Sequence, residues 1–295
     1  MITRGVYAAS LSVLNKDYSL NIEATIAHAE SIIHKGLHGI FFFGSTGQSQ
    51  LISMNEKKDF ISKISTHKLK KNFFLGTGNN SIKENIDLIK YGIEYDFNTF
   101  LIMPPAYYKG NTDEGVINFY THIITRVPKV KIILYNFEKL SGYKFTAEVI
   151  KKLVEKYPKN IIGCKDSSYN LFEHLKLPNF FMFPGSEAKL LKGLKAGCAG
   201  CISAVTNVTH QLSRKVFDDF ESKAEPSSNE KLISVRETFD QFNLISGLHS
   251  FMSINDSNYE NLLPPLILLS DEKKNELLLN LKRFDFIPEK KIKAA

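Results

Sequence analysis

The 295-residue sequence contains only three cysteines, Cys164, Cys198 and Cys201. A small, odd number in a long chain is a poor basis for a disulfide framework, so reduced thiols are expected. Cys198 and Cys201 have a C-x-x-C spacing, but the segment AGCAGCISAV is typical of a tight turn that leads into a buried strand. A redox or metal site at these cysteines is therefore disfavoured.

The sequence also lacks a long apolar run and a recognisable targeting segment. The aromatic stretch FFFG at 41–44 is far shorter than the roughly 18 residues that a membrane-spanning helix needs. The chain runs from Met1 into GVYAAS without the charged, apolar and small-residue regions of a signal peptide. These absences predict a cytoplasmic protein that is not embedded in a membrane.

The formal net charge is +7, but motifs that read nucleic acid are missing. Lysines are dispersed along the chain, and the densest basic stretch, Lys290, Lys291 and Lys293, lies near the C-terminus. Dispersed lysines are typical of a solvated surface. Neither a nucleic acid nor a membrane is therefore expected as a partner.

What the sequence does contain is a regular alternation of short apolar runs and segments with helical periodicity. The apolar runs span 5–10, 39–44, 73–78, 99–105, 131–136, 160–166, 180–185 and 200–205. The helical segments span 21–36, 54–66, 81–92, 113–126, 146–156, 168–176, 186–196 and 208–221. The runs are almost continuously hydrophobic, as in parallel strands that are covered on both faces. This pattern predicts an α/β fold, a TIM (β/α)8 barrel over residues 1–221.

After residue 221 the pattern becomes helical only. Helical stretches lie near 229–247, 257–269 and 271–283, and SKAEPSSNEK at 222–231 has the composition of a linker. We therefore expect residues 222–295 to form a C-terminal helical region that packs on the barrel.

Lys165 is the main catalytic candidate, because it ends the apolar strand IIGCKD. In a βα barrel the reacting groups lie where strands end, and an amine in an apolar strand needs a partner or a reaction to justify its burial. Burial disfavours an ammonium ion and favours the nucleophilic free amine. The alternatives are a lysine that reaches solvent from the strand end, or one that pairs with Asp166.

Two further strand ends carry groups that suit an imine-forming lysine. Tyr135 ends the preceding strand KIILYN, and its phenol could move protons during Schiff-base chemistry if it shares the barrel interior with Lys165. Ser45, Thr46 and Gly47 follow the second strand within GSTG, where flexible backbone and two hydroxyls could hold a carboxylate. A core tyrosine and a simple turn are the alternatives.

Together, GSTG at 44–47, YN at 135–136 and GCKDSS at 163–168 resemble the dihydrodipicolinate synthase and N-acetylneuraminate lyase family, over about residues 4–208. The resemblance implies a class I aldolase, a lyase in which Lys165 forms an imine with pyruvate and Tyr135 relays protons. It also implies that Ser45 and Thr46 hold the pyruvate carboxylate.

The same resemblance assigns roles to other positions. Gly185 and Ile202 match residues that line the pocket with backbone groups, and Tyr107 matches a catalytic aromatic that family members lend across a tight dimer interface. It further implies a homotetramer built from two such dimers, small-molecule substrates, and neither a metal nor an organic cofactor.

The substrate-selecting positions depart from both named activities. Leu140 stands where dipicolinate synthases usually carry an arginine for the carboxylate of the aldehyde, although Lys139 beside it could partly substitute. Leu140 begins an LSG segment like that of sialic acid lyases, but Ala188 and Ala204 replace polar residues that those enzymes use.

These departures favour a pyruvate-yielding lyase for a 2-keto-3-deoxy sugar acid or a related 2-keto acid. Glu187 and Thr206 could meet the hydroxyls of such a substrate, and Leu140 would line the same pocket. The alternatives are 4-hydroxy-tetrahydrodipicolinate synthesis, N-acetylneuraminate cleavage, and an inactive barrel that serves as a binding protein.

Overall fold

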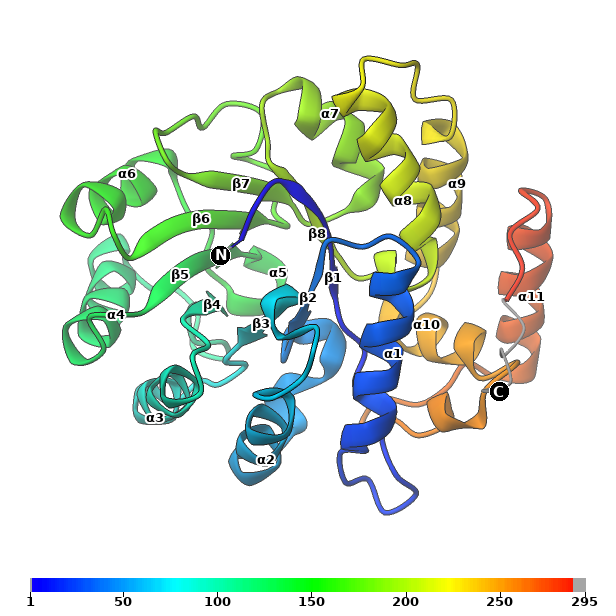
Figure 1. The fold of residues 1–295 in the computed structure, drawn as a ribbon, viewed down its shortest axis with the longest axis horizontal. Helices are drawn as coiled ribbons and strands as arrows, with labels where there is room; N and C mark the ends of the chain where they lie inside the picture. Colours follow the sequence, from blue (N-terminus) through cyan, green and yellow to red (C-terminus); the bar gives the residue numbers. More distant parts are fainter. Residues whose placement is uncertain (1, 289–295) are drawn as a thin grey trace.

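The computed structural model describes residues 2–288, and its centre is a barrel of eight parallel strands in sequence order (Figure 1). The strands are β1 (Gly5–Ala9), β2 (Gly39–Phe42), β3 (Phe73–Gly76), β4 (Thr99–Ile102), β5 (Lys131–Asn136), β6 (Ile161–Asp166), β7 (Phe181–Pro184) and β8 (Gly200–Ser203). β1 pairs with both β2 and β8. The Ala199 amide donates to the Met182 carbonyl at 2.9 Å and so links β7 to the segment entering β8. The barrel is therefore nearly closed, and the predicted fold class is confirmed.

Helices follow the strands, and all but a four-residue helix at the end of β5 cover the outside of the barrel. They are α1 (Ile22–His34), α2 (Met54–Ile64), α3 (Ile82–Glu94), α4 (Asp113–Arg126), α5 (Glu138–Ser141), α6 (Ala147–Lys156), α7 (Leu190–Lys195) and α8 (Thr206–Glu221). Side chains cap the start of α3 and of α6, where Ser81 accepts from the Glu84 amide and Thr146 from the Val149 amide. Such bonds satisfy amides that lack a partner within the helix.

The two faces of each strand pack into separate cores, which explains the almost continuous hydrophobicity of the strands. One face looks into the barrel, where Tyr7 makes edge contacts with Phe41, Phe74 and Phe183 at ring-centroid distances of 5.7–5.8 Å. The other face packs under the helices and includes Cys164. Because successive side chains alternate, the neighbours of Cys164 point into the barrel.

The predicted helix at 168–176 is wrong, because this segment consists of turns. The carboxylate of Asp166 accepts hydrogen bonds from the backbone amides of Tyr169, Leu171 and Phe172. The segment is therefore wrapped around one buried carboxylate, and apolar periodicity alone does not reveal that arrangement.

The C-terminal region contains three α-helices within the described residues: α9 (Asn229–Asp240), α10 (Leu244–Met252) and α11 (Asp271–Lys282). The predicted helix at 229–247 is thus two helices, because Asn243 caps a new one through the Ser246 amide. The predicted helix at 257–269 is wrong: only Ser257–Tyr259 forms a 3-10 turn, and Pro264 and Pro265 follow within the same segment. The basic stretch at 290–293 lies outside the described residues.

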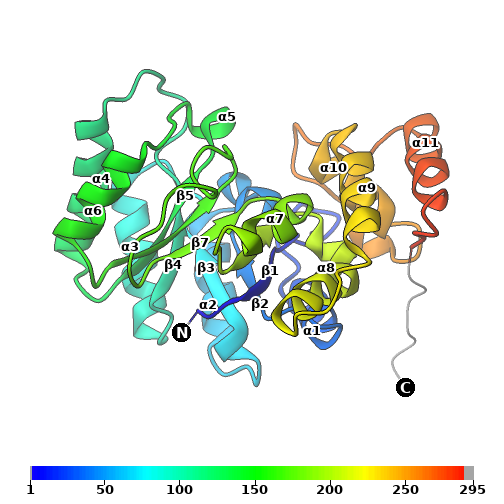
Figure 2. The same ribbon diagram turned by 90° about the horizontal axis from the view of Figure 1, so that it is seen from above.

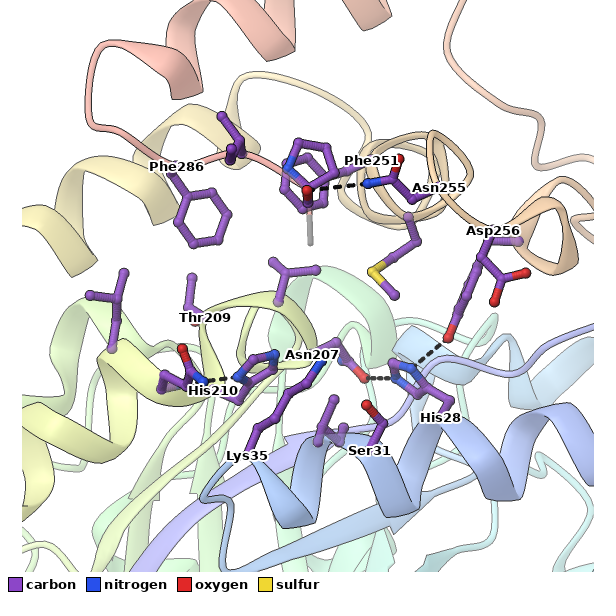
Figure 3. Close-up of a pocket in the computed structure, with 18 of the residues that line it drawn as sticks. His28, Ser31, Lys35, Asn207, Thr209, His210, Phe251, Asn255, Asp256 and Phe286 are labelled. Atoms are coloured by element: carbon purple, nitrogen blue, oxygen red, sulfur yellow. Dashed lines mark hydrogen bonds between the residues drawn. The ribbon is translucent and has the colours of Figure 1, made fainter. Parts of the chain in front are cut away.

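Figures 1 and 2 both show these C-terminal helices beside α1 and α8, on the side of the barrel away from α3, α4 and α6. A cavity of about 640 Å³ lies between α1, α8 and the C-terminal region (Figure 3). At its floor, the His28 ring is bonded on one side to Asn207, at 2.8 Å, and on the other to the Tyr259 hydroxyl, at 2.7 Å. His28 thus joins the barrel to this region through Tyr259, and the Tyr259 carbonyl in turn bonds to a second buried histidine, His249 on α10, at 3.1 Å.

Because of these two buried histidines, we expect the folded protein to lose stability in mild acid. Burial lowers the pKa of His28 and of His249 to about 4, from an ordinary value of 6.5. The unfolded chain takes up these protons first, so stability that is complete above pH 6.5 is lost as the pH falls towards 4. We expect the free energy of unfolding, measured by urea titration, to fall by about 2 kcal/mol per histidine between pH 6.5 and pH 5.

The variant His249→Gln tests this assignment. Its free energy of unfolding should depend less steeply on pH than that of the unmodified protein, by about one proton over the same range. An unchanged pH dependence in His249→Gln would show that His249 is not one of the responsible groups.

Candidate active site

Lys165 and Tyr135 face each other inside the barrel. They are paired in register on β6 and β5, and the Lys165 Nζ lies 4.2 Å from the centre of the Tyr135 ring. The two side chains are only 3% and 5% exposed, so Lys165 does not reach into solvent. Asp166 points to the opposite face of β6, where Asn136 and backbone amides occupy its carboxylate. The lysine and the tyrosine therefore lie side by side in the barrel interior, as predicted for a pair that would carry out imine chemistry with proton relay.

The GSTG segment lies next to the same tyrosine. Ser45 and Thr46 belong to a short 3-10 helix, Ser45–Gly47, that begins three residues after the last residue of β2. The Ser45 Oγ lies 3.0 Å from the Tyr135 hydroxyl, and Thr46 is buried. The carbonyl of Gly47 accepts from the Ser12 hydroxyl at 2.7 Å, and an added Cβ would come within 2.8 Å of the Ser10 carbonyl oxygen. The turn is thus held so that the Ser45 hydroxyl reaches Tyr135.

A cleft of about 230 Å³ opens beside this pair. Ser45, Tyr135 and Leu140 line it, together with Gln48, Asn79 and other uncharged residues. Leu140 is 39% exposed, and the described residues that line the cleft include no lysine or arginine. The cleft can therefore offer hydroxyl and amide groups to a ligand, but its lining has no cation for a second carboxylate.

Gly185 and Ile202, which were predicted to line the pocket with backbone groups, lie at the ends of β7 and β8. Gly185 follows β7 and is half-buried, and its own amide donates to the Asp166 carbonyl at 2.8 Å. Ser167 lies against Gly185 so closely that a Cβ there would sit within 2 Å of the Ser167 Oγ. Ile202 lies on β8 with its side chain in the barrel core. The structure thus places both residues around the interior that contains Lys165.

Tyr107 and Thr206 are not brought to the Lys165 pair within one chain. Tyr107 is 80% exposed, has a left-handed backbone with φ of 83°, and packs edge-on against Tyr108. Thr206 is fully buried, and its hydroxyl donates to the carbonyls of Ser203 and Tyr7. Its hydroxyl is thus engaged within the protein.

Glu187 occupies an ion pair that the sequence did not suggest. Its carboxylate is completely buried, accepts from the Ser203 hydroxyl, and lies 3.2 Å from the guanidinium of Arg236 on α9. Arg236 also bonds to Asp240 at 2.9 Å. Burial lowers the pKa of Arg236, but the charges of Glu187 and Asp240 outweigh burial and raise it. A buried glutamate at a strand end is expected to pair with a cation, but the sequence alone does not identify Arg236 as that cation.

A second buried lysine, Lys57 on α2, was also missed. Its Nζ donates to the Thr77 carbonyl at 3.0 Å and to the Asn79 side chain at 2.8 Å. Burial lowers the pKa of Lys57 to about 8. Because the side chain is fully enclosed and its amine is bonded to the β3–α3 loop, Lys57 supports the wall of the cleft.

The three cysteines agree with the sequence expectation of reduced thiols. All three cysteines are buried and unpaired, and Cys198 lies between a turn at 196–197 and β8, as the AGCAGCISAV segment predicted. Within residues 2–288 no cluster of three or more His, Cys, Asp or Glu side chains could hold a metal ion. No helix in that range is long and apolar enough to cross a membrane.

Comparison with known proteins matches nearly the whole chain to a single protein family. A family model described as the dihydrodipicolinate synthetase family matches residues 2–284. An uncharacterized DapA-like lyase from Chloroflexus aurantiacus is 26% identical, covering 92% of this chain and 93% of its own length. A 2-dehydro-3-deoxy-D-gluconate/2-dehydro-3-deoxy-phosphogluconate aldolase from Picrophilus torridus is 28% identical, covering 67% of this chain and 76% of its own length.

The fold is similar to that of solved structures in the same family. A prophage protein of the dihydrodipicolinic acid synthase family from E. coli K12, solved in complex with pyruvate, has a TM-score of 0.87 at 22% identity and covers 97% of this chain and 100% of its own. With the family model spanning nearly the whole chain, this protein belongs to the dihydrodipicolinate synthetase family of lyases.

Proposed function

We propose that this lyase uses Lys165 to form a Schiff base and reversibly cleaves a 2-keto-3-deoxy sugar acid, or a related 2-keto acid, to pyruvate and an uncharged aldehyde. The observation that carries the proposal is the buried Lys165, a residue only 3% exposed whose Nζ lies 4.2 Å from the centre of the Tyr135 ring inside the barrel. The E. coli structure was solved in complex with pyruvate, and the Picrophilus torridus relative is named as a 2-dehydro-3-deoxy-D-gluconate/2-dehydro-3-deoxy-phosphogluconate aldolase.

In the proposed reaction the Lys165 amine attacks the C2 carbonyl of the keto acid and, after loss of water, forms an iminium ion. Loss of the C4 hydroxyl proton then breaks the C3–C4 bond, which releases the aldehyde and leaves an enamine on Lys165. Tyr135, bonded to the Ser45 hydroxyl, would return the proton at C3 before water releases pyruvate. Ser45 and Thr46 would hold the carboxylate, with the backbone of Gly47, Gly185 and Ile202 around it.

The uncharged lining of the cleft supports a neutral aldehyde. Dipicolinate synthesis would require the cleft to bind a second carboxylate, and Leu140 offers no charge or hydrogen bond there. Lys139 is exposed and does not line this cleft. Arg236 and Ser203 both bond to Oε2 of Glu187, whereas Oε1 has no hydrogen-bond partner among the described residues. Oε1 is therefore the atom of Glu187 that would contact a substrate hydroxyl.

We also propose that the protein works as an oligomer, with a tetramer as the expected form. Tyr107 and Tyr108 are 80% and 73% exposed beside the cleft-lining Ala106. Exposed neighbouring aromatics are typical of a protein interface. A second chain covering them would bring Tyr107 towards an active site, as the catalytic role proposed for it requires.

Borohydride reduction in the presence of pyruvate tests the Schiff base. Peptide mass spectrometry should find a reduced pyruvyl adduct on Lys165, absent from Lys165→Ala. Lys57 is an internal control, because it is equally buried but has its amine bonded to the β3–α3 loop, so it should stay unlabelled. No adduct on Lys165 at neutral pH would refute the proposed mechanism and favour an inactive binding barrel.

The aldehyde is tested in the condensation direction. With pyruvate, D-glyceraldehyde should give a product and aspartate semialdehyde little or none. The reverse preference would overturn the sugar-acid assignment in favour of 4-hydroxy-tetrahydrodipicolinate synthesis, while leaving the Lys165 mechanism in place.

A further inference from the structure

The carboxylate beside the reactive lysine is completely buried and fully bonded. Asp166 follows Lys165 on β6 but faces away from the barrel interior. Its Oδ1 accepts from the Asn136 side chain at 2.8 Å and from the Tyr169 amide at 2.9 Å. Its Oδ2 accepts from the amides of Leu171 and Phe172 at 2.8 and 3.0 Å. Hydrogen bonds to a charged acceptor are among the stronger ones in proteins, so this carboxylate anchors the loop that leaves β6.

Asn136, at the end of β5, links Asp166 to Asn170 in the loop after β6 and to Phe145 before α6. Its amide nitrogen also donates to the Asn170 side chain at 2.8 Å, and its amide oxygen accepts from the Phe145 amide at 3.1 Å. Asn170 in turn donates to the Phe145 carbonyl at 2.9 Å. The ends of β5 and β6 and the segment before α6 are thus held by one side-chain network.

The pairing of β5 with β6 places this network next to Tyr135 and Lys165. Asn136 opposes Asp166 in the ladder in which Tyr135 opposes Lys165. One pair points outward and is locked by hydrogen bonds, and the other points inward and has no covalent or ionic tie between its members. Because adjacent residues share a backbone, the outward pair determines how closely the inward pair can approach.

We propose that Asn136 and Asp166, together called the strand-end clasp, are positioning residues for the imine chemistry. The clasp keeps the Tyr135 ring against the Lys165 amine and holds Ser167 on Gly185 in the neighbouring strand end. It touches no reacting atom. This inference rests on the proposed Schiff-base function, since it concerns the geometry of the same lysine and tyrosine.

The physical reason is the steep dependence of catalysis on distance. A displacement of about 1 Å can cost on the order of 10²-fold in rate. Asp166→Asn keeps the shape of the side chain but replaces one acceptor oxygen by an NH₂ group, which would face N–H donors. Asn136→Ala removes the clasp from the other strand. Both changes should let the ends of β5 and β6 separate.

The test follows two steps on the proposed pathway: the rate at which pyruvate becomes trapped by borohydride, and the exchange of pyruvate C3 protons for deuterium. Asn136→Ala and Asp166→Asn should each slow C3 exchange by about 10- to 100-fold. The KM for pyruvate should change far less than kcat, because the clasp does not line the carboxylate cradle. Measurements are made well below the melting temperature of each variant, so that the folded fraction is the same.

Asn160→Ala is the matched control. The Asn160 side chain donates to the carbonyls of Pro128 and Val130 at 2.8 and 2.7 Å, and so ties β5 to β6 at their opposite ends. It should lower the melting temperature yet leave both rates within about twofold of the unmodified protein.

Equal slowing by Asn160→Ala would overturn the proposal and indicate a general effect of strand stability. Unchanged rates in Asn136→Ala would also overturn it, and that variant decides the question if Asp166→Asn does not fold. The unmodified protein is measured first, so absence of any pyruvate adduct there refutes the proposed function and is distinct from either outcome for the clasp.

Discussion

Tyr135→Phe is expected to lower kcat for cleavage of the keto acid by about 10²- to 10⁴-fold. The substitution removes only the hydroxyl that bonds to Ser45 at 3.0 Å and keeps the ring that lies over Lys165. Proton transfer to and from the carbinolamine and the enamine then loses its proposed carrier. Because the amine remains in place, the Lys165 adduct should still form at long incubation times.

Stopped assays of pyruvate release measure this effect, and Tyr7→Phe provides the control. Tyr7 is also an interior tyrosine, but its hydroxyl is engaged with Thr3 near the N-terminal end of β1. Tyr7→Phe should therefore leave kcat within about twofold of the unmodified protein. A Tyr135→Phe enzyme with normal kcat would exclude the phenol as the proton carrier.

Arg236→Met is expected to lower the free energy of unfolding by about 3 to 5 kcal/mol. The change leaves the fully buried carboxylate of Glu187 without its cation, and only the Ser203 hydroxyl would remain as a partner on that oxygen. Methionine fills a similar volume, so the loss reflects the unpaired charge more than a cavity. Urea titration at pH 7 measures the difference.

The exposed ion pair Lys273–Glu276 serves as the comparison. Its side chains are 54% and 43% exposed, and Glu276→Gln should change the free energy of unfolding by less than about 1 kcal/mol. If Arg236→Met were as mild as Glu276→Gln, Glu187 would have to be held by other groups. The double variant Arg236→Met/Glu187→Gln should recover part of the lost stability, since the buried charge is then removed.

The sequence by itself determined the barrel and singled out Tyr135 and Lys165 as the candidate reacting pair. Parallel strands buried on both faces need continuous apolar runs, and the alternation of side chains puts Lys165 on the face of its strand opposite to Cys164. That Tyr135 faces the same interior was a hypothesis, which the register of the two strands confirms. The apolar runs and the alternation are local consequences of strand geometry. They depend on residue spacing and not on distant contacts.

The tertiary structure alone decided how the site is supported. The segment after Lys165 is a loop wrapped around Asp166, although its apolar spacing favoured a helix, because a buried carboxylate draws backbone amides to itself. Glu187 meets Arg236, 49 residues later in the chain, through the packing of α9 on the barrel. Pairing of buried charges depends on which distant segments come together, and spacing along a single chain does not encode that choice.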